Sequence, residues 1–526
     1  MGAPQRTLSI ADIGQLIAGF DISRARPTFA TLYLGLESAK KSHFRKSDKQ
    51  RAYDIARLRK AGARGTLHQL VLAESILYAL TGNYACLSRI SKLLRTHANA
   101  LSLSSLFHAW HCFMAVPFDR AETFSDFQKL KLDYHSRGIY QALLDQAAPL
   151  ADAVPISQPD PNDRVKIGIC VTQFMGRRHA PTAAALTLAE TYLAMGYEVA
   201  ILNQSLVPRA ITSGFYYVGL APKLLELDGV TSLQLQGGQA DFFQNAEDEI
   251  LPVSYVAFAE ALDRFGVTRL ISLGPGNLYA DLAGRSIRNI AMPSTVDLSI
   301  GRPGAFACVR PLPAMRTRLL ERLGVSKEQI IDVPSGFSLP NQQAAYERAE
   351  LGLTDEDYAI AIVSNRLGQE LSQPFLDKLL SFLAKAPSAK VRVFGTVGSS
   401  TDRLKAFFAA HRQIEFIGFA KDLPSVLSVF DAVLNPPRMG GGTSAAYAMA
   451  KGVNVFTLDN CDVANVVGPD FVYADETDLW DALLSASKDN TLGQAARTKA
   501  LAQWKVISDQ RGQAERLLAH ARITAP

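Results

Sequence analysis

The stretch NPPRMGGGTSAAYAMAKG, from Asn435 to Gly452, joins a strand to a helix through three consecutive glycines. Its two prolines end the strand, and the run rich in Ala and Met after the glycines favours a helix. The first turn of a helix carries unpaired backbone N–H groups and the positive end of the helix dipole, so it attracts anions. Glycines let an anion approach the backbone because they have no Cβ, and the hydroxyls that follow can add donors or cap the helix. The stretch therefore predicts a site for an anion such as a diphosphate. The residues that we expect to hold the anion are Gly440, Gly441, Gly442, Thr443 and Ser444.

A tight strand-to-helix turn with a Ser or Thr cap is the alternative interpretation of the same residues. Three glycines are more than such a cap requires, which favours the anion site. No Lys follows the glycines, so the stretch is not a P-loop.

Strands and helices alternate on both sides of this stretch. A buried strand at RVKIGICVTQF (164–174) opens one alternating series, and YAIAIVSN (358–365) opens a second. Such alternation predicts parallel sheets covered by helices, with ligands beyond the carboxyl ends of the strands. We therefore expect an α/β protein with two doubly wound Rossmann-like domains facing a cleft, at residues 164–340 and 341–526.

The first part of the chain has a different character. Residues 1–152 place apolar residues at helical spacing, which predicts an all-helical domain. A proline-rich linker follows at 153–163. The net charge is +5 overall, but residues 1–160 hold 20 Lys and Arg against 13 Asp and Glu, a balance of +7. Ten of these basic residues lie between Lys40 and Arg64.

The basic segment from Lys40 to Arg64 has two interpretations. It is either a solvated helix face or a surface for an anionic partner such as an acidic protein or a membrane. We expect no nucleic acid, because no aromatic residues are interleaved in the pattern typical of single-strand binding. Three features of the sequence favour a cytoplasmic protein. The five cysteines are scattered without a CxxC pair, the N-terminus fits a secretory signal poorly, and the sequence has no long apolar segment.

The glycine stretch and its surroundings resemble a known family. The order of elements in GFAKDLPSVLSVFDAVLNPPRMGGGTSAAYAMAKGVNVFTLDN (418–460) is similar to the donor-binding half of GT-B glycosyltransferases. VPSGFSLP (333–340) stands where that fold crosses between its domains. The resemblance implies GT-B architecture after the helical domain, with the diphosphate of a nucleotide sugar lying on the glycine loop.

Within this fold, the sequence departs from the large retaining family that carries Glu-x7-Glu here, since Met439 and Tyr447 occupy those positions. The loop is more similar to that of bacterial adhesin N-glycosyltransferases and O-GlcNAc transferases, which are inverting and metal-independent and can carry a helical domain. That resemblance implies transfer of a hexose from a nucleotide sugar, which we expect to be UDP-linked, to an acceptor for which a protein side chain is the candidate. It implies no metal and no further cofactor. Asp459 then becomes the candidate ribose contact, with a strand-end turn as the alternative role.

Three further residues are candidates for chemistry. Arg366 follows the first strand of the last domain and could hold the pyrophosphate, alone or with Arg438. His179 lies between the first strand and first helix of the middle domain, where it could act as general base toward the acceptor. An anion contact with Arg177 and Arg178 is the alternative role for this loop, and Asp297 is an alternative base.

Two other motifs point to no separate site. GPGNLYADLAG (274–284) lacks the third glycine of a dinucleotide fingerprint, so we expect it to be a loop lining the interdomain cleft. His108 and His111 lie in an apolar helical run without a third ligand, which favours core packing over metal binding.

Two alternative functions remain. The first keeps the chemistry but transfers sugar to a lipid-linked or polysaccharide acceptor, and a related nucleotide-sugar epimerase would share the fold. The second is a catalytically inactive GT-B protein that acts as the partner of an active enzyme, since both glutamates are missing.

Overall fold

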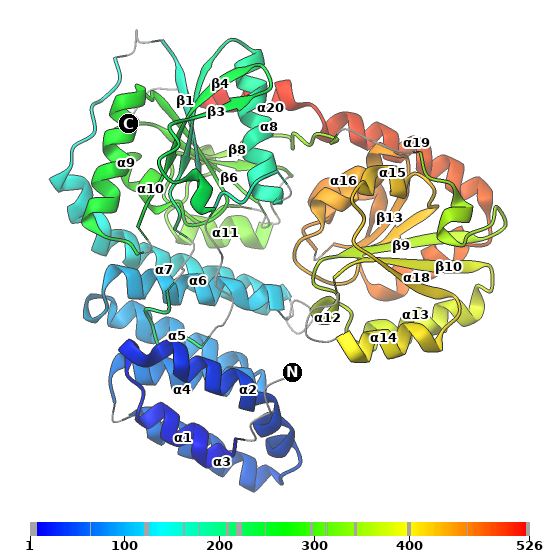
Figure 1. Cartoon of the computed structure of the whole chain (residues 1–526), viewed down its shortest axis with the longest axis horizontal. Coiled ribbons are helices and arrows are strands. Elements are labelled where there is room, and N and C mark those ends of the chain that lie inside the picture. Colours follow the sequence, from blue (N-terminus) through cyan, green and yellow to red (C-terminus); the bar gives the residue numbers. More distant parts are fainter. Residues whose placement is uncertain are drawn as a thin grey trace.

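The computed structural model contains a helical region followed by two α/β units (Figure 1). It describes residues 8–63, 65–119, 126–160, 164–177, 179–206, 210–216, 224–247, 249–294, 298–310, 312, 314–340, 345–396, 401–459 and 461–521. Among these residues, no helix is both long and apolar enough to cross a bilayer.

The helical region contains α1 (Ile10–Ala18), α2 (Ala25–Phe44), α3 (Asp48–Ala63), α4 (Leu67–Thr81), α5 (Tyr84–Thr96), α6 (Leu103–Asp119) and α7 (Asp126–Ala153). Local chemistry sets several of these boundaries. At the start of α4, the side chain of Thr66 accepts the N–H of Gln69, whose side chain accepts the N–H of Thr66 in return. The helix ends at Gly82, which has a left-handed conformation with φ of 67°.

The first Rossmann unit contains β1 (Lys166–Val171), α8 (Ala180–Ala194), β2 (Glu198–Asn203), β3 (Ser232–Leu235), β4 (Gly238–Gln244), α9 (Pro252–Phe265), β5 (Arg269–Leu273), α10 (Leu278–Ala283), β6 (Asn289–Met292), β7 (Ala305–Cys308), α11 (Ala314–Arg322) and β8 (Ile330–Asp332). Its strand order is β3-β4-β2-β1-β5-β6-β7-β8. Neighbouring strands are parallel except for the β3–β4 pair at one edge.

The second Rossmann unit contains β9 (Tyr358–Ser364), α12 (Leu367–Glu370), α13 (Gln373–Lys385), β10 (Ala389–Gly395), α14 (Thr401–Ala410), β11 (Ile414–Gly418), α15 (Leu423–Leu427), β12 (Ala432–Leu434), α16 (Gly442–Ala450), β13 (Asn454–Leu458), α17 (Ala464–Val467), β14 (Val472–Tyr473), α18 (Glu476–Ala486) and α19 (Asn490–Ile507). Its strands are all parallel in the order β11-β10-β9-β12-β13-β14. The predicted fold class, two doubly wound units after a helical region, is confirmed.

The last helix, α20 (Gln510–Ala521), leaves the second unit and packs on the first, beside α8 (Figure 1). Ala514, Leu517 and Leu518 are buried in the same cluster as the inner residues of β1 and β2. The Tyr192 hydroxyl of α8 donates to the carbonyl oxygen of Ala514 at 3.1 Å. The chain therefore crosses between the two Rossmann units twice.

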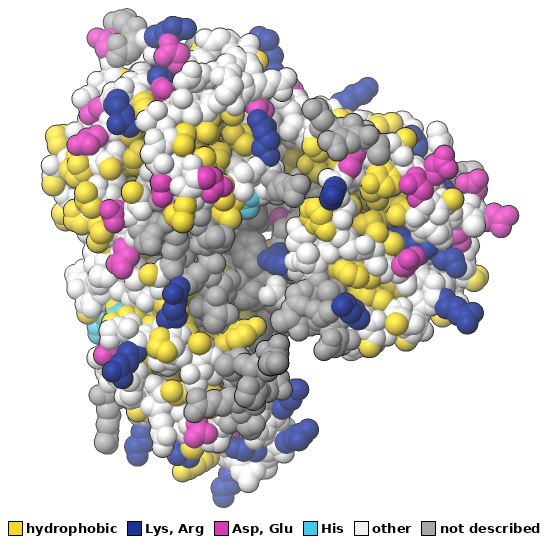
Figure 2. Space-filling view, in the orientation of Figure 1, with side chains coloured by type: hydrophobic (Ala, Val, Ile, Leu, Met, Phe, Trp, Pro, Cys, Tyr) yellow, Lys and Arg dark blue, Asp and Glu magenta, His cyan; other side chains and the backbone are white. Residues whose placement is uncertain are grey.

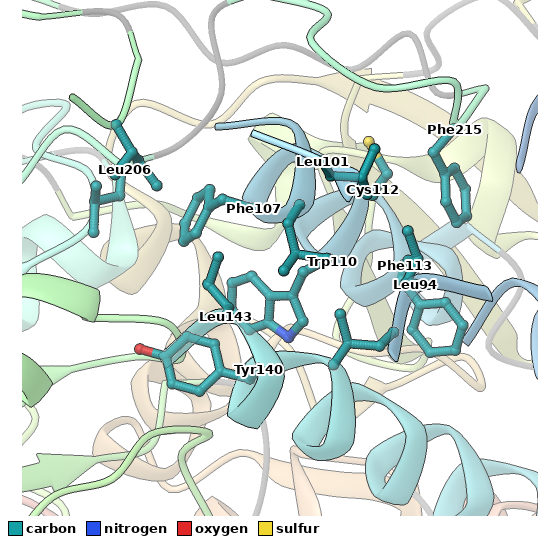
Figure 3. Packing of buried hydrophobic residues seen from close by; sticks show 14 of the residues in the cluster. Leu94, Leu101, Phe107, Trp110, Cys112, Phe113, Tyr140, Leu143, Leu206 and Phe215 are labelled. Carbon is teal, nitrogen blue, oxygen red and sulfur yellow. The ribbon is translucent and has the colours of Figure 1, made fainter. Parts of the chain in front are cut away.

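The helical region shares a hydrophobic core with the first Rossmann unit. Trp110 of α6 and Tyr140 of α7 lie with ring centroids 4.9 Å apart. They belong to the same buried cluster as Leu206 and Phe215 of the first unit, which lie on opposite sides of the view in Figure 3. Arg137 donates to the carbonyl oxygens of Leu298 and Ser299, each at 2.9 Å. The helical region is therefore packed firmly against the first sheet.

The stretch from Gly274 to Gly284 differs from its prediction as a cleft loop. It contains α10, whose Tyr279 is completely buried and whose Asp281 accepts the Tyr140 hydroxyl at 2.7 Å. A Cβ at Gly276 would collide with the ring of Trp110. This glycine lets the helical region approach the backbone, and the prediction of a cleft-lining loop was wrong.

Candidate functional site

A cavity of about 260 Å³ lies between the two Rossmann units. One wall is the first turns of α8, and the opposite wall is the glycine loop with the start of α16. The connection at Ser335–Ser338 and Gln513 of α20 close one side. Apart from the loop, most lining side chains are small or apolar. They include Ala180, Pro181, Ala183, Ala184, Leu188, Met292, Pro293, Phe337, Tyr447 and Val466.

The glycine loop has the geometry that the sequence predicts at the start of a helix. Gly440 and Gly441 both have φ of 101°, a region that side chains disfavour, and α16 begins at Gly442. The N–H groups of Gly442, Thr443 and Ser444 have no hydrogen-bond acceptor among the described residues. Gly442 and Thr443 line the cavity, so these first-turn donors and the positive end of the helix dipole have the arrangement that suits an anion. The Ser444 hydroxyl instead donates to the carbonyl oxygen of Gly441 at 2.8 Å, so it supports the turn.

The two candidate arginines share one buried carboxylate beneath this loop. Arg438 is 7% exposed and donates to Glu370 at 2.8 Å and to Asn435 at 2.7 Å. Arg366 lies 2.8 Å from the other oxygen of Glu370 and donates to the carbonyl oxygen of Met439. Arg438 therefore acts from below the loop, whereas Arg366 is partly exposed beside Gly440.

Asp462 is a site residue that the sequence interpretation missed. It lies beyond the carboxyl end of β13, lines the cavity, and accepts the N–H of Gly440 at 2.8 Å. Burial raises the pKa of Asp462 to about 6, although Arg438 and the N–H of Gly440 both favour the carboxylate. A carboxyl group with a pKa of about 6 thus lines the same cavity as the glycine loop. Its place after a strand end was a usable signal, but Asp459 gave the same signal.

Asp459 forms an ion pair across the two Rossmann units. One of its carboxylate oxygens lies 2.9 Å from Nη1 of Arg310, which follows β7 in the first unit. The Asp459 side chain remains 62% exposed. The predicted ribose contact stays a prediction, in which Arg310 would compete with the ribose.

His179 lies at the N-terminus of α8, directly before the cavity-lining Ala180. Its Nδ1 is 2.9 Å from the Thr182 hydroxyl, which also accepts the N–H of Met175. Burial lowers the pKa of His179, which keeps the ring neutral and able to accept a proton at pH 7. If Nδ1 carries the ring proton and donates to Thr182, Nε2 is the basic nitrogen.

Of the other candidates named with His179, the structure describes only Arg177. Arg177 pairs with Glu190 of α8 and is mostly exposed. Arg178 and Asp297 lie outside the described residues, so their predicted roles remain untested.

The structure agrees with the core interpretation of the helical histidines. His108 is buried and lies 2.7 Å from the Ser213 hydroxyl. Burial lowers the pKa of His108 to about 3 and that of His111 to about 4. Within the described ranges, no three His, Cys, Asp or Glu side chains form a group that could hold a metal ion.

No protein-family model and no curated protein matches this sequence. Among solved structures, a mutant of the Thermobaculum terrenum O-GlcNAc transferase aligns over 99% of this chain and 98% of its own, with 16% identity and a TM-score of 0.50. The chain has the GT-B fold. At this identity the match shows the fold alone, and the predicted GT-B resemblance is confirmed at that level.

Two further GT-B structures match about two thirds of the chain. A glycosyltransferase from Rickettsia africae aligns over 69% of this chain and 98% of its own, with 11% identity and a TM-score of 0.47. Anabaena HepE, solved in complex with UDP and glucose, aligns over 68% of this chain and 98% of its own, with 13% identity and a TM-score of 0.42.

Proposed function

We propose that this GT-B protein transfers a hexose from a UDP-linked nucleotide sugar to an acceptor bound in the interdomain cavity. The observation that carries the proposal is the row of N–H groups at Gly442, Thr443 and Ser444, which have no acceptor in the described part of the chain and of which the first two line the cavity. Such donors match the diphosphate that leaves in glycosyl transfer, because they stabilise negative charge where it develops.

Arg366 is the side chain that would join these N–H groups on the diphosphate. If it leaves Oε1 of Glu370, Arg438 and the hydroxyl of Ser364 remain bonded to Oε2 of that carboxylate. The buried carboxylate is thus never left unpaired, which would be strongly destabilising. In this proposal Arg438 positions the loop, and Asp462 is protonated when the diphosphate binds.

His179 is the proposed general base. Its Nε2 takes the proton from the acceptor as the acceptor atom bonds to the anomeric carbon, and the bond from that carbon to the diphosphate oxygen breaks. This single displacement inverts the anomeric configuration. We propose that it needs no metal ion or further cofactor, because the helix N-terminus and Arg366 meet the charge of the leaving group.

The acceptor side of the proposal rests on the helical region. We propose that residues 1–152 recognise an acceptor protein and present a side chain to the cavity. The five cysteines are all buried and form no disulfide among the described residues, which supports a cytoplasmic location for the reaction.

The experiment is calorimetric titration of the full-length protein and its variants with UDP. Gly442→Asp sets a carboxylate against the phosphate, so we expect UDP affinity to fall at least 100-fold. Gly493→Asp is the matched control, because a Cβ at this exposed glycine of α19 would meet no atom within 4 Å and the residue lies away from the cavity. Equal UDP affinity in both variants would remove the glycine loop from the site.

Slow hydrolysis separates an enzyme from an inactive partner protein. An active transferase releases free hexose and UDP from UDP-hexose over hours, and His179→Ala should suppress this release without weakening UDP binding. Tight UDP binding without hydrolysis would contradict the proposed transfer activity. Hydrolysis that is unchanged in His179→Ala would contradict the assigned base.

A further inference from the structure

The surface of α2 and α3 at the end of the molecule far from the cavity carries exposed cations and exposed aromatic side chains. Dark blue side chains are visible along this end in Figure 2, which is the end labelled α1 to α3 in Figure 1. We call it the α2–α3 surface. It consists of Tyr33, Lys41, Phe44, Arg45, Lys49, Tyr53, Arg57 and Lys60, all exposed.

The positive charge of the α2–α3 surface is not neutralised by its own acids. The segment 40–60 holds nine Lys and Arg but only two Asp. Asp48 pairs with Arg51, while Asp54 is buried between His43 at 3.1 Å and Lys46 at 2.8 Å. The exposed cations that remain have no carboxylate partner among the described residues. They are Lys41, Arg45, Lys49, Arg57 and Lys60.

The aromatic side chains are unusually exposed. Tyr33 and Phe44 are each 52% exposed, and Tyr53 is 68% exposed. Among the described residues, only one other aromatic side chain, Phe419, is comparably exposed. Three of these four therefore lie within one helical hairpin, although exposing an aromatic ring forfeits the free energy of its burial.

Helical spacing brings the two rings of α2 to one face and places the ring of α3 beside two lysines. Tyr33 and Phe44 are eleven residues apart, or three turns, so they share one face of α2. Lys49, Tyr53 and Lys60 share one face of α3 for the same reason. The exposed rings therefore lie beside exposed cations on this folded surface.

We propose that the α2–α3 surface binds peripherally to a bilayer that contains anionic lipids. Lys and Arg then contact the headgroups, while the aromatic rings enter the boundary between headgroups and acyl chains. The rings on α2 are about 16 Å apart, whereas neighbouring bases of a nucleic acid strand are about 3.4 Å apart. A flat bilayer accepts any spacing of rings, but base stacking does not. This inference does not depend on the proposed transfer reaction.

The test is sedimentation of the full-length protein with vesicles of phosphatidylcholine alone or with about one third phosphatidylglycerol. Each cation near an anionic surface contributes about a fivefold gain in binding. We therefore expect binding only to the anionic vesicles, and a loss of at least 100-fold in Lys41→Glu/Arg45→Glu/Lys49→Glu. The control Lys385→Glu/Lys405→Glu/Lys488→Glu makes the same change of charge on exposed lysines of the second Rossmann unit and should bind like the unmodified protein.

The aromatic contribution is measured separately with Phe44→Ser/Tyr53→Ser. We expect this variant to lose most of the vesicle binding that persists at 0.5 M salt, where charge attraction is screened. Unchanged thermal unfolding would show that these variants remain folded, since every altered side chain is exposed. Equal binding to both vesicle types, equal loss in the control variant, or tighter binding to a single-stranded oligonucleotide than to vesicles would overturn the proposal.

Discussion

Gly441 occupies a position where two separate demands exclude any side chain. Its φ of 101° is unfavourable for other residues, and a Cβ would collide with the guanidinium of Arg438 beneath the loop. Gly442 differs, because its φ is not positive and its nearest neighbour, Val466, would lie 3.2 Å from a Cβ. The loop glycines thus have different physical roles, which the sequence pattern alone does not reveal.

We predict that Gly441→Ala lowers the free energy of unfolding by about 2 to 4 kcal/mol, from backbone strain and displacement of Arg438. Gly442→Ala should cost less than about 1 kcal/mol, because it requires only a small shift of Val466. Urea unfolding followed by tryptophan fluorescence measures both. Similar losses in the two variants would contradict the role given to Arg438.

Asp462 predicts a pH dependence of donor binding. Its pKa of about 6 means that the carboxyl becomes charged as the pH rises from 5 to 8, which sets a negative charge against the diphosphate. Affinity for UDP-hexose should fall by up to about 100-fold over that range, a factor of ten for each pH unit above the pKa. Asp462→Asn should bind the donor tightly and almost independently of pH. Calorimetry at pH 5.5 and pH 8 measures the effect, and parallel profiles in the two proteins would contradict it.

At the scale of residues, the sequence was sufficient to predict which residues group together when they are neighbours along the chain. The glycine loop, its helix start and Arg438 lie within ten residues, so local rules predicted their grouping. Glu370 lies 68 residues from Arg438 and joins the site only because parallel strands bring their carboxyl ends to one edge. Which of the acids at that edge turns inward depends on side-chain packing, so the sequence pattern led to Asp459 and did not identify Asp462.

At the scale of elements, a buried hydrogen bond between α7 and α10 involves a carboxyl group whose charge depends on pH. Asp281 accepts hydrogen bonds from Tyr140 at 2.7 Å and from Asn289 at 3.2 Å. Burial raises the pKa of Asp281 to about 7, against the opposing effect of these hydrogen bonds. The folded protein therefore holds this proton at pH values where the unfolded chain, with a pKa near 3.9, has lost it.

The sign of the resulting effect follows from proton linkage. The stabilising contribution of protonated Asp281 is complete below the unfolded pKa and is lost as the pH rises through the folded pKa. In the unmodified protein, we expect the unfolding free energy to fall by an amount on the order of 2 to 4 kcal/mol between pH 4 and pH 8. We predict that this fall is absent in Asp281→Asn. Urea unfolding at several pH values measures the difference, with the exposed Asp481→Asn as control. The same pH profile in both variants would contradict the assignment.

Strong periodicity made most elements predictable, whereas short or unusual ones were missed. The strand β7 has only four residues, and β4 contains Gly and Asp, which are rare in strands. The helix α10 was interpreted as a loop because of its two preceding glycines, of which Gly276 is required by its contact with Trp110. That contact arises between distant parts of the chain, so no local pattern records it.

Over the whole molecule, the ion pair between Arg310 and Asp459 connects the two Rossmann units beside the cavity. A partly exposed pair contributes about 0 to 1 kcal/mol, so removing it should change donor affinity less than about fivefold. We predict that Asp459→Asn and Arg310→Gln have the same small effect if Asp459 acts only through this pair. If Asp459 contacts the ribose directly, donor affinity should instead fall about 10- to 100-fold in Asp459→Asn and stay unchanged in Arg310→Gln. Titration of both variants with UDP distinguishes the two roles.

The double crossing between the Rossmann units has a consequence for how the protein is made. Tyr192 and Ala514, which contact each other, are separated by 322 positions along the chain. During synthesis, the apolar surface of the first unit that α20 covers, beside α8, therefore stays exposed until α20 has left the ribosome. Folding of the first unit is completed only after the second has been translated, and a chaperone that shields this face during the interval would raise the yield.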